Sequence, residues 1–190
     1  MPNRQLLRPP KMWLMTDERL GDDLFASIAA LPRGSGIVFR HYSLAKQERQ
    51  VIFDMVSAAA RRHRHILVVG GKKLKTRTWA VDGVHGSGRT RDWPIRTVAV
   101  HSRREAIAAK RLGADLLFVS PVFATMSHPG ARVLGRSRFG LLIRRIDQPI
   151  IALGGMTPSR ARGVQSMGIY GWAAISAFAV RCQKRNAVPT

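Results

Sequence analysis

The feature of this 190-residue sequence that most constrains its fold is a series of short apolar segments that recur along its length. Most of them lack the alternation of polar and apolar residues that marks a half-exposed strand, which indicates strands buried on both faces. The expected strands are residues 13–16, 36–40, 66–69, 83–85, 97–100, 116–119, 150–153 and 172–175.

Between several of these segments, apolar residues recur at spacings of three and four with basic residues opposite, which predicts helices that pack one face on a sheet. The expected helices are residues 24–31, 45–62, 103–112, 137–146 and 158–167. Strands that alternate with helices form parallel βαβ units. We therefore expect the α/β class and a single (β/α)8 TIM barrel.

The length predicts a shortened barrel, because this fold typically takes about 250 residues. Residues 72–81 alone link the third and fourth strands, and the next link, 86–96, contains glycines and a proline that oppose a regular helix. The chain after Ser176 is also brief. We therefore expect βα units 3, 4 and 8 to be trimmed.

No linker divides the chain, so we expect one barrel domain over residues 13–186, with a basic N-terminal leader over 1–12 and a tail over 187–190. The leader lacks the apolar region of a secretory signal, and no apolar segment is long enough to cross a membrane. The single Cys182 cannot form an internal disulfide. These features favour the cytoplasm, and they leave the oligomeric state open, a homo-oligomer included.

The chain has a formal net charge of +21, from 32 Lys and Arg against 11 Asp and Glu. Its densest basic run, residues 61–65 followed by Lys72, Lys73, Lys75 and Arg77, fits nucleic-acid binding through counterion release. However, aromatic residues make up only 7% of the chain, and no RNA- or DNA-binding motif accompanies the charges. We favour solvated basic helix faces and keep nucleic-acid binding as the alternative.

Functional residues of a (β/α)8 barrel collect at the C-terminal ends of its strands. The last two strands end in Gly154-Gly155 and Ile175-Ser176, and a helix opens after Thr157. Loop backbone N–H groups and a helix N-terminus at this place hold anions. We therefore predict a phosphate clamp at these strand ends, built without a lysine.

Other strand ends supply a cation and two histidines. Arg40 is the candidate anion contact, because a guanidinium offers a planar fork that matches phosphate; a salt bridge to Asp17 at the neighbouring strand end is the open alternative. His85 and His101 end adjacent strands and are candidates to face each other across the barrel mouth. Zinc is not expected, because the sequence shows no HxxH pair, Cys cluster or third ligand.

The segment 120–128 is too long and too rich in hydroxyl groups for a plain turn, so it predicts a flexible ligand loop. Thr125, Ser127 and His128 are its candidate functional side chains. An ordinary surface loop capped by Ser and Thr is the alternative. The sequence contains no GxSxG elbow, P-loop or GxGxxG helix opening, which argues against the enzyme classes that use them.

Several short motifs follow one another in a specific order between Trp13 and Phe178. They are Trp13-Leu-Met-Thr-Asp17, Asp82-Gly-Val-His85, His101-Ser102, Gly113-Ala-Asp115, Ser120-Pro-Val-Phe-Ala-Thr125, Ile151-Ala-Leu-Gly-Gly155 and Ala174-Ile-Ser176. In this order they resemble thiamine phosphate synthase and its relative the thiazole tautomerase. The resemblance implies a (β/α)8 barrel and a transferase of thiamine biosynthesis, which joins a hydroxymethylpyrimidine pyrophosphate to a thiazole phosphate and releases pyrophosphate. It also implies Mg²⁺, which helps the pyrophosphate to leave.

Carried over position by position, the resemblance implies that Gly155, Ile175 and Ser176 hold the thiazole phosphate, and that Arg40 contacts the pyrophosphate. The candidate site therefore has three parts. They are the catalytic residues Arg40, Ser127 and His128, the phosphate-binding residues Thr125, Gly154, Gly155, Ile175 and Ser176, and the pyrophosphate or pyrimidine side at Arg40, Tyr42, Gly70, Gly71 and His101.

The chain departs from the family pattern on the metal side. The Asn-Asp pair expected after the third strand falls on Gly70-Gly71, and the next metal carboxylate falls on Thr90. The expected carboxylate ligands of Mg²⁺ are thus absent, and Asp17 or Asp92 are the candidate substitutes. Alternatively, the cations Lys72, Lys73, Arg89 and Arg91 neutralise the pyrophosphate in place of the metal.

These departures leave alternative functions open. One is a diverged, non-catalytic or regulatory protein that binds thiazole phosphate or thiamine phosphate. Another is an enzyme like the thiazole tautomerase, but the histidine that the tautomerase pattern places before the Val-Phe pair falls on Pro121.

Overall fold

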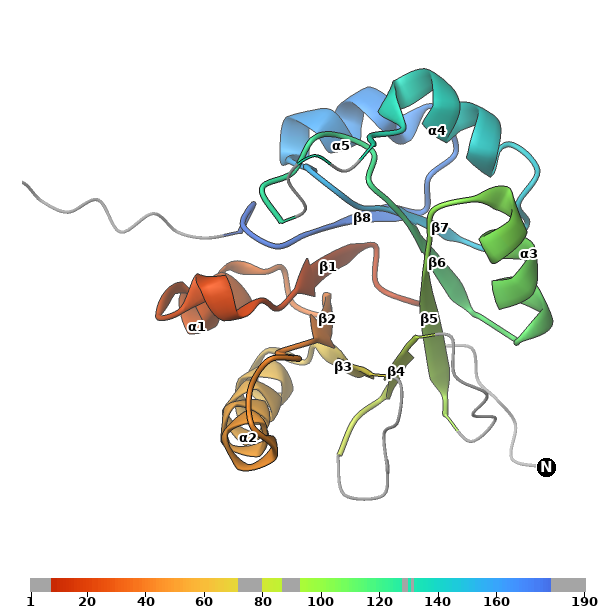
Figure 1. Cartoon of the computed structure of the whole chain (residues 1–190). Coiled ribbons are helices and arrows are strands. Elements are labelled where there is room, and N and C mark those ends of the chain that lie inside the picture. Colours follow the sequence, from red (N-terminus) through yellow and green to blue (C-terminus); the bar gives the residue numbers. More distant parts are fainter. Residues whose placement is uncertain (1–7, 72–79, 87–92, 128–129, 131, 179–190) are drawn as a thin grey trace, which may run out of the picture.

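The computed structural model describes residues 8–71, 80–86, 93–127, 130 and 132–178, and it contains a closed barrel of eight parallel strands (Figure 1). The strands follow one another around the barrel in sequence order. They are β1 (Met12–Met15), β2 (Gly36–Phe39), β3 (Ile66–Gly70), β4 (Gly83–His85), β5 (Ile95–Val100), β6 (Leu116–Val119), β7 (Ile150–Ala152) and β8 (Gly171–Ala174). The predicted fold class and all eight expected strands are confirmed.

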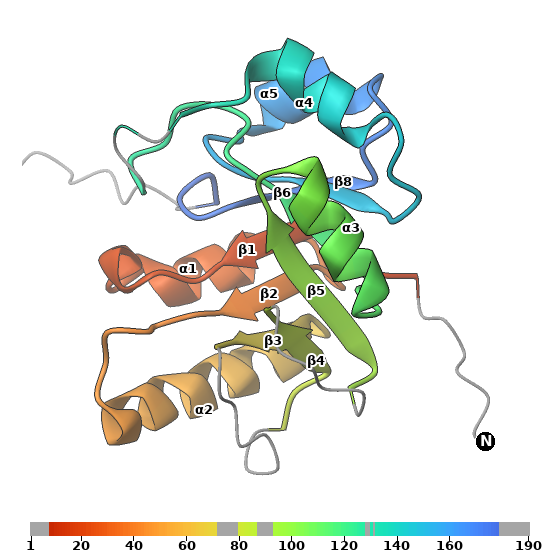
Figure 2. The ribbon, with the colours of Figure 1, turned by 45° about the vertical axis from the view of Figure 1, so that its right-hand side comes forward.

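Five α-helices lie outside the barrel, as the periodicity of the sequence predicts, and a short 3-10 helix, η1 (Glu18–Leu20), follows β1. The α-helices are α1 (Asp23–Ala30), α2 (Lys46–His63), α3 (Arg103–Arg111), α4 (Gly135–Ile143) and α5 (Pro158–Gln165). Figure 2 shows α1 and α2 along β1 to β3, whereas α3, α4 and α5 cover the other side of the barrel. Helix bounds shift from the expected ones by a few residues, because caps rather than apolar spacing end a helix.

The units that the sequence predicts to be trimmed are described only in part. Within the described residues, no helix lies between β3 and β4, between β4 and β5, or after β8. Much of these links, with Thr90, Asp92 and the cations of 72–79 and 87–92, lies outside the described residues.

The segment before β1 is joined to the base of the barrel. Lys11 O accepts a hydrogen bond from Trp172 N at 2.8 Å, and Pro9 O accepts one from the Tyr170 hydroxyl at 2.5 Å. Met12 already belongs to β1. Residues 9–12 therefore contact the barrel or form part of it, so the leader expected over residues 1–12 extends too far.

Most of the strands contribute at least one apolar side chain to the barrel interior, because alternate residues of each strand point inward. Trp13, Val38, Phe118 and Ile151 are all fully buried there. Trp13 and Phe118 meet edge to face with ring centroids 5.4 Å apart. The other face of each strand packs against the helices, which explains why the strand segments are apolar throughout.

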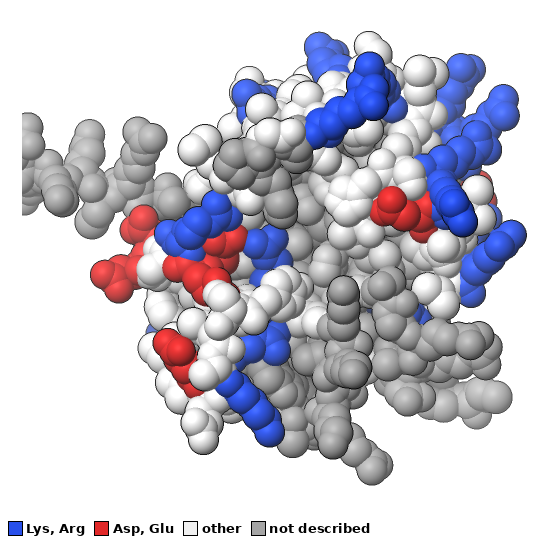
Figure 3. Space-filling model, viewed as in Figure 1, with Lys and Arg blue, Asp and Glu red and all other residues white. Residues whose placement is uncertain are grey.

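The densest described basic run has a local structural role. Arg61, Arg62 and His63 form the last turn of α2, where positive charge interacts favourably with the negative end of the helix dipole. On the face drawn in Figure 3, Lys and Arg side chains are spread over several elements rather than gathered in one patch. No helix among the described residues is both long and apolar enough to span a bilayer.

Replacing Phe118 with alanine tests the barrel interior. Because Phe118 is fully buried against Trp13 and His85, we expect Phe118→Ala to lower the free energy of unfolding by about 3–5 kcal/mol. Urea denaturation followed by circular dichroism measures it. Leu141→Ala is the control, since Leu141 is 72% exposed, and its effect should stay within about 0.5 kcal/mol. Equal losses for both variants would contradict the assignment of the core.

Candidate active site

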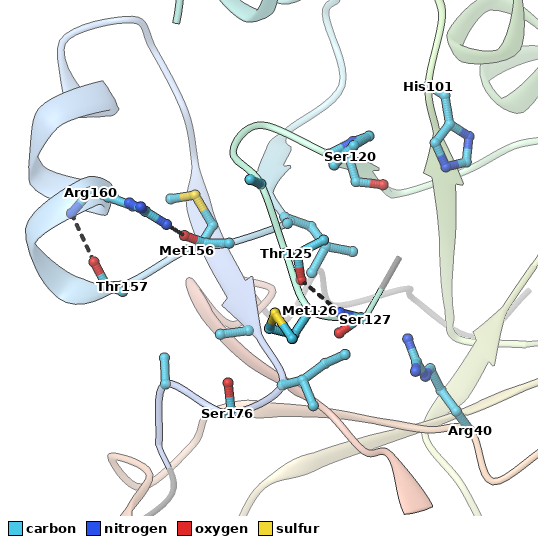
Figure 4. A pocket seen from close by; sticks show the side chains of 18 residues that line it. Arg40, His101, Ser120, Thr125, Met126, Ser127, Met156, Thr157, Arg160 and Ser176 are labelled. Atoms are coloured by element: carbon cyan, nitrogen blue, oxygen red, sulfur yellow. Dashed lines mark hydrogen bonds between the residues drawn. The ribbon is translucent and has the colours of Figure 1, made fainter. Parts of the chain in front are cut away.

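A cavity of about 450 Å³ opens at the C-terminal ends of the strands (Figure 4). The walls come from the segments after β2, β5, β6, β7 and β8 and from the start of α5. The sequence-predicted residues that line it are Arg40, His101, Thr125, Ser127, Gly154, Gly155, Ile175 and Ser176. Residues that lie far apart in the sequence therefore meet around one space, as the strand-end argument predicts.

Gly154 and Gly155 let two loops pack backbone against backbone. Both have positive φ angles, 92° and 60°, that side-chain-bearing residues rarely adopt. A Cβ on Gly154 would lie 2.7 Å from Pro121 Cα, and one on Gly155 would overlap the carbonyl oxygen of Ala124. Phe123 N donates to Gly154 O at 3.0 Å. The loop after β6 is thus held directly against the clamp.

The clamp presents unused backbone donors to the cavity. Within the described residues, the N–H groups of Gly154, Gly155 and Ser176 donate no hydrogen bond. Helix α5 begins beside them at Pro158, and its N-cap Thr157 accepts a hydrogen bond from Arg160 N at 3.2 Å. Free backbone N–H groups beside a helix N-terminus form an arrangement that binds anions.

The loop after β6 lines the cavity, and one hydrogen bond within it and one from η1 add to its contacts with the clamp. Thr125 Oγ1 accepts a hydrogen bond from Ser127 N at 3.3 Å. Met126, 84% exposed at the loop tip, accepts a hydrogen bond on its carbonyl oxygen from Arg19 Nη1 at 3.1 Å. The predicted residue His128 lies outside the described residues.

Arg40 forms the salt bridge to Asp17 that was the alternative expected from the sequence, and its role as an anion contact stays a prediction. Its Nη2 lies 2.6 Å from Asp17 Oδ2, and the side chain also lines the cavity. Its Nε is buried and has no hydrogen-bond partner within the described part of the chain. A donor of this kind is costly to bury unless something accepts from it.

Asp17 is shared between two arginines. Arg19 Nε lies 2.6 Å from Asp17 Oδ1, and Arg40 binds the other carboxylate oxygen. The hydrogen bond from Arg19, with the charge of Arg40, lowers the pKa of Asp17 to about 2, although burial opposes the shift. The carboxylate is therefore ionised and fully engaged at neutral pH.

The end of β3 is closed by side chains from the β2–α2 segment. A Cβ on Gly70 would overlap the hydroxyl of Tyr42, so the Tyr42 ring takes the place of a side chain there. Arg49 Nη2 donates to Gly70 O at 2.8 Å and to Arg40 O at 2.9 Å. Tyr42, Gly70 and Gly71 do not line the cavity, so the structure does not bring this part of the predicted site to it.

The described residues do not fit a Mg²⁺ ion, which prefers carboxylate and other oxygen ligands. Gly70 and Gly71 offer no side-chain ligand, and the carboxylate of Asp17 is already paired with Arg19 and Arg40. Among the residues that the structure describes, no group of three or more His, Cys, Asp or Glu side chains is positioned to hold a metal ion.

The two histidines do not face each other as expected. His85 is buried, its Nδ1 lies 2.7 Å from Thr97 Oγ1, and burial lowers its pKa to about 4. The exposed His101 lines the cavity and pairs through Nδ1 with Glu105 Oε2 at 3.0 Å. The last residue of β4 points into the barrel interior, whereas His101 follows the end of β5 and is turned toward α3 by Glu105.

Sequence reasoning missed two arginines, Arg160 and also Arg19, which binds Asp17 and the carbonyl oxygen of Met126. Arg160 lines the cavity beside the clamp. A signal for it existed: side chains in the first turn of a helix lean toward the N-terminus, and the sequence already placed that N-terminus at the clamp. No comparable signal existed for Arg19, because its contacts depend on the short helix η1.

Comparisons with known proteins agree with this geometry. The model of the family described as thiamine monophosphate synthase matches residues 13–178. The chain is 27% identical over 179 residues to thiamine-phosphate synthase of Pyrococcus furiosus, covering 88% of this chain and 86% of the relative. For the enzyme of Chloroflexus aurantiacus the identity is 29% over 183 residues, covering 88% and 84%.

A solved structure is similar over the same extent. The thiamine phosphate pyrophosphorylase from Pyrococcus furiosus superposes with a TM-score of 0.75 at 26% sequence identity. The match covers 90% of this chain and 88% of that chain. The likeness therefore extends over most of the barrel.

Replacing Gly155 with alanine tests the contact between the clamp and the loop after β6. Because the new Cβ would meet the carbonyl oxygen of Ala124 at a positive φ, we expect Gly155→Ala to lower the free energy of unfolding by about 1–3 kcal/mol. Gly163→Ala is the control. Gly163 lies in α5 with open space around it, so alanine should stabilise the protein by about 0.5–1 kcal/mol. Stabilisation by both substitutions, in urea denaturation, would refute the close contact.

Asp17→Asn tests the ion pairs through pH. Because the pKa of Asp17 is lowered from 3.8 to about 2 in the folded chain, the unfolded chain takes up the proton first as the pH falls. The advantage of wild type over Asp17→Asn in unfolding free energy should be complete above pH 4 and disappear toward pH 2. The exposed Asp147, paired with Lys110, gives the control Asp147→Asn, whose effect should be smaller. An undiminished advantage of wild type at pH 2 would contradict this account.

Proposed function

This chain belongs to the thiamine monophosphate synthase family, and on that premise we propose that it is a thiamine-phosphate synthase. The proposed reaction joins a thiazole phosphate to a hydroxymethylpyrimidine pyrophosphate and releases pyrophosphate. The observation that carries the proposal is the cavity itself: a backbone clamp for an anion lies in one wall, and Arg40 lies in another.

We assign the thiazole phosphate to the clamp. The unused N–H groups of Gly154, Gly155 and Ser176 support this assignment, because they point to an anion that needs several hydrogen-bond donors. Thr125 and Ser127 line the cavity on the loop opposite. Their hydroxyl groups would orient the ring between the clamp and Arg40 (Figure 4).

We assign the pyrophosphate side to Arg40. In the proposed step, the thiazole nitrogen forms a bond to the pyrimidine methylene carbon, and the bond from that carbon to the pyrophosphate oxygen breaks with its electron pair leaving on the oxygen. Arg40 has a buried Nε without a partner among the described residues. A fixed guanidinium there would stabilise the charge that develops on the leaving oxygen.

The metal side of the family pattern is not carried over. The described donors do not fit Mg²⁺, so no step is assigned to it, and stabilisation of the leaving group is assigned to Arg40. The predicted contribution of His128 and of the cations at 72–79 and 87–92 stays a prediction.

A second function has one observation in its favour. Gly70 and Gly71 replace the expected metal ligands, and Tyr42 covers that strand end, which is compatible with a protein that binds thiazole phosphate or thiamine phosphate without catalysis. Under either function thiazole phosphate or thiamine phosphate should bind and raise the melting temperature, since a ligand that binds the native state stabilises it. Only the synthase releases pyrophosphate.

Pyrophosphate release therefore tests the proposed function. Incubation of the full chain with both substrates should produce pyrophosphate and thiamine phosphate, and the chain should restore growth of a thiamine-requiring strain that lacks the synthase. Arg40→Gln should lower kcat by about 10²–10³-fold, whereas Arg138→Gln, on the outer surface of α4, should not. Binding of thiazole phosphate without product would instead favour the non-catalytic function.

A further inference from the structure

Arg160 is a cation at the clamp that neither the strand ends nor the family motifs assign. It is the third residue of α5, which begins at Pro158 directly after the clamp. Its side chain lines the cavity (Figure 4), and Nη1 donates to Gly155 O at 2.5 Å. The guanidinium is thus fixed to Gly155, which lines the cavity and whose N–H group donates no hydrogen bond within the described residues.

The ring of Phe123 supports the guanidinium from one side. Arg160 Cζ lies 5.0 Å from the Phe123 ring centroid, within the range of a cation–π contact. Phe123 belongs to the loop that packs against the clamp, and its N donates to Gly154 O. Two contacts therefore hold Arg160 in place, and both come from the structure that forms the clamp.

The remaining donors of Arg160 are unused. Within the described residues, Nε and Nη2 make no hydrogen bond, and no carboxylate forms an ion pair with this side chain. A guanidinium carries five N–H donors in a fixed fork. Part of that fork therefore remains available beside the clamp.

The charge of Arg160 lies where the helix already carries positive potential. The first turn of α5 contains no acidic residue, and a cation near a helix N-terminus is unfavourable unless an anion balances it. The free N–H groups of Gly154, Gly155 and Ser176 add partial positive charge at the same place. Donors from the loops, the helix end and the side chain all favour an anion on the cavity side.

We propose that Arg160 is a further phosphate-binding residue, which contacts the phosphate monoester in the clamp and makes the site selective for the phosphorylated thiazole over the free thiazole alcohol. The inference rests on the proposed function for the identity of the ligand. Nη1 stays on Gly155 O, while Nε and Nη2 donate to phosphate oxygens. The backbone clamp gives the position of the phosphate, and Arg160 gives the site a full positive charge that a neutral alcohol cannot use.

The experiment compares two arginines of one helix. Arg160→Gln removes the charge at the cavity, and Arg162→Gln removes an equal charge two residues away, from an exposed side chain that does not line it. Calorimetry on the full chain gives Kd for thiazole phosphate, and competition against it gives Kd for the thiazole alcohol. Arg160→Gln should raise Kd for the phosphate about tenfold or more and leave Kd for the alcohol within about twofold of the wild-type value. Arg162→Gln should change neither Kd.

Arg160→Lys separates charge from structure. Lysine keeps the charge but lacks the fork, so it should recover part of the selectivity for phosphate. An equal loss of affinity for phosphate and alcohol in Arg160→Gln would mean that Arg160 only supports the loop, and this result would overturn the proposal. So would an unchanged Kd for the phosphate.

Inorganic phosphate makes the inference testable apart from the proposed function. If the wild-type chain releases no pyrophosphate but inorganic phosphate raises its melting temperature, loss of that shift in Arg160→Gln and its retention in Arg162→Gln would support Arg160 as a phosphate ligand. Equal shifts in the two variants would overturn the inference even in a chain that catalyses the synthase reaction.

Discussion

Pairing of β8 with β1 closes the sheet, and the position of the cavity depends on that closure. Trp13 lies opposite Ala173 and Leu14 opposite Ala174 in this pairing, and Lys11 extends it through its hydrogen bond from Trp172 N. A closed sheet of parallel strands directs all eight C-terminal ends to one mouth. The ends of β2 and β8, which are far apart in the sequence, thereby face one space.

The sequence was sufficient to predict the barrel, but it did not predict the arrangement of side chains on the pyrophosphate side of the site. The reason for this difference is physical. Strands buried on both faces must be apolar throughout, so each strand can be recognised in the sequence as an apolar segment. The sequence also placed Gly154, Gly155 and Ser176 at strand ends, and the structure places all three in the cavity wall. Where side chains point was harder to predict. His85 and His101 both lie at strand ends, yet one turns into the interior against Phe118 and the other toward Glu105.

The two halves of the site differ in what they are made of. The clamp uses backbone N–H groups, which every residue but proline has, so it needs only chain conformation and the close contact between Gly155 and Ala124. The metal side of the family pattern uses carboxylates and an amide at fixed positions. Such a set is lost when single residues change, as at Gly70 and Gly71. A barrel can therefore keep its anion clamp while its metal ligands are replaced.

Near the ends of β2 and β3, arginines hold the backbone and a carboxylate. Arg49 donates to the carbonyl oxygens of Arg40 and Gly70, and Arg40 shares Asp17 with Arg19. On that side the carboxylate of Asp17 offsets part of the positive charge of Arg19 and Arg40, and a guanidinium attracts a pyrophosphate but repels a divalent metal ion. With Arg160 at the clamp, each proposed anionic group has its own arginine.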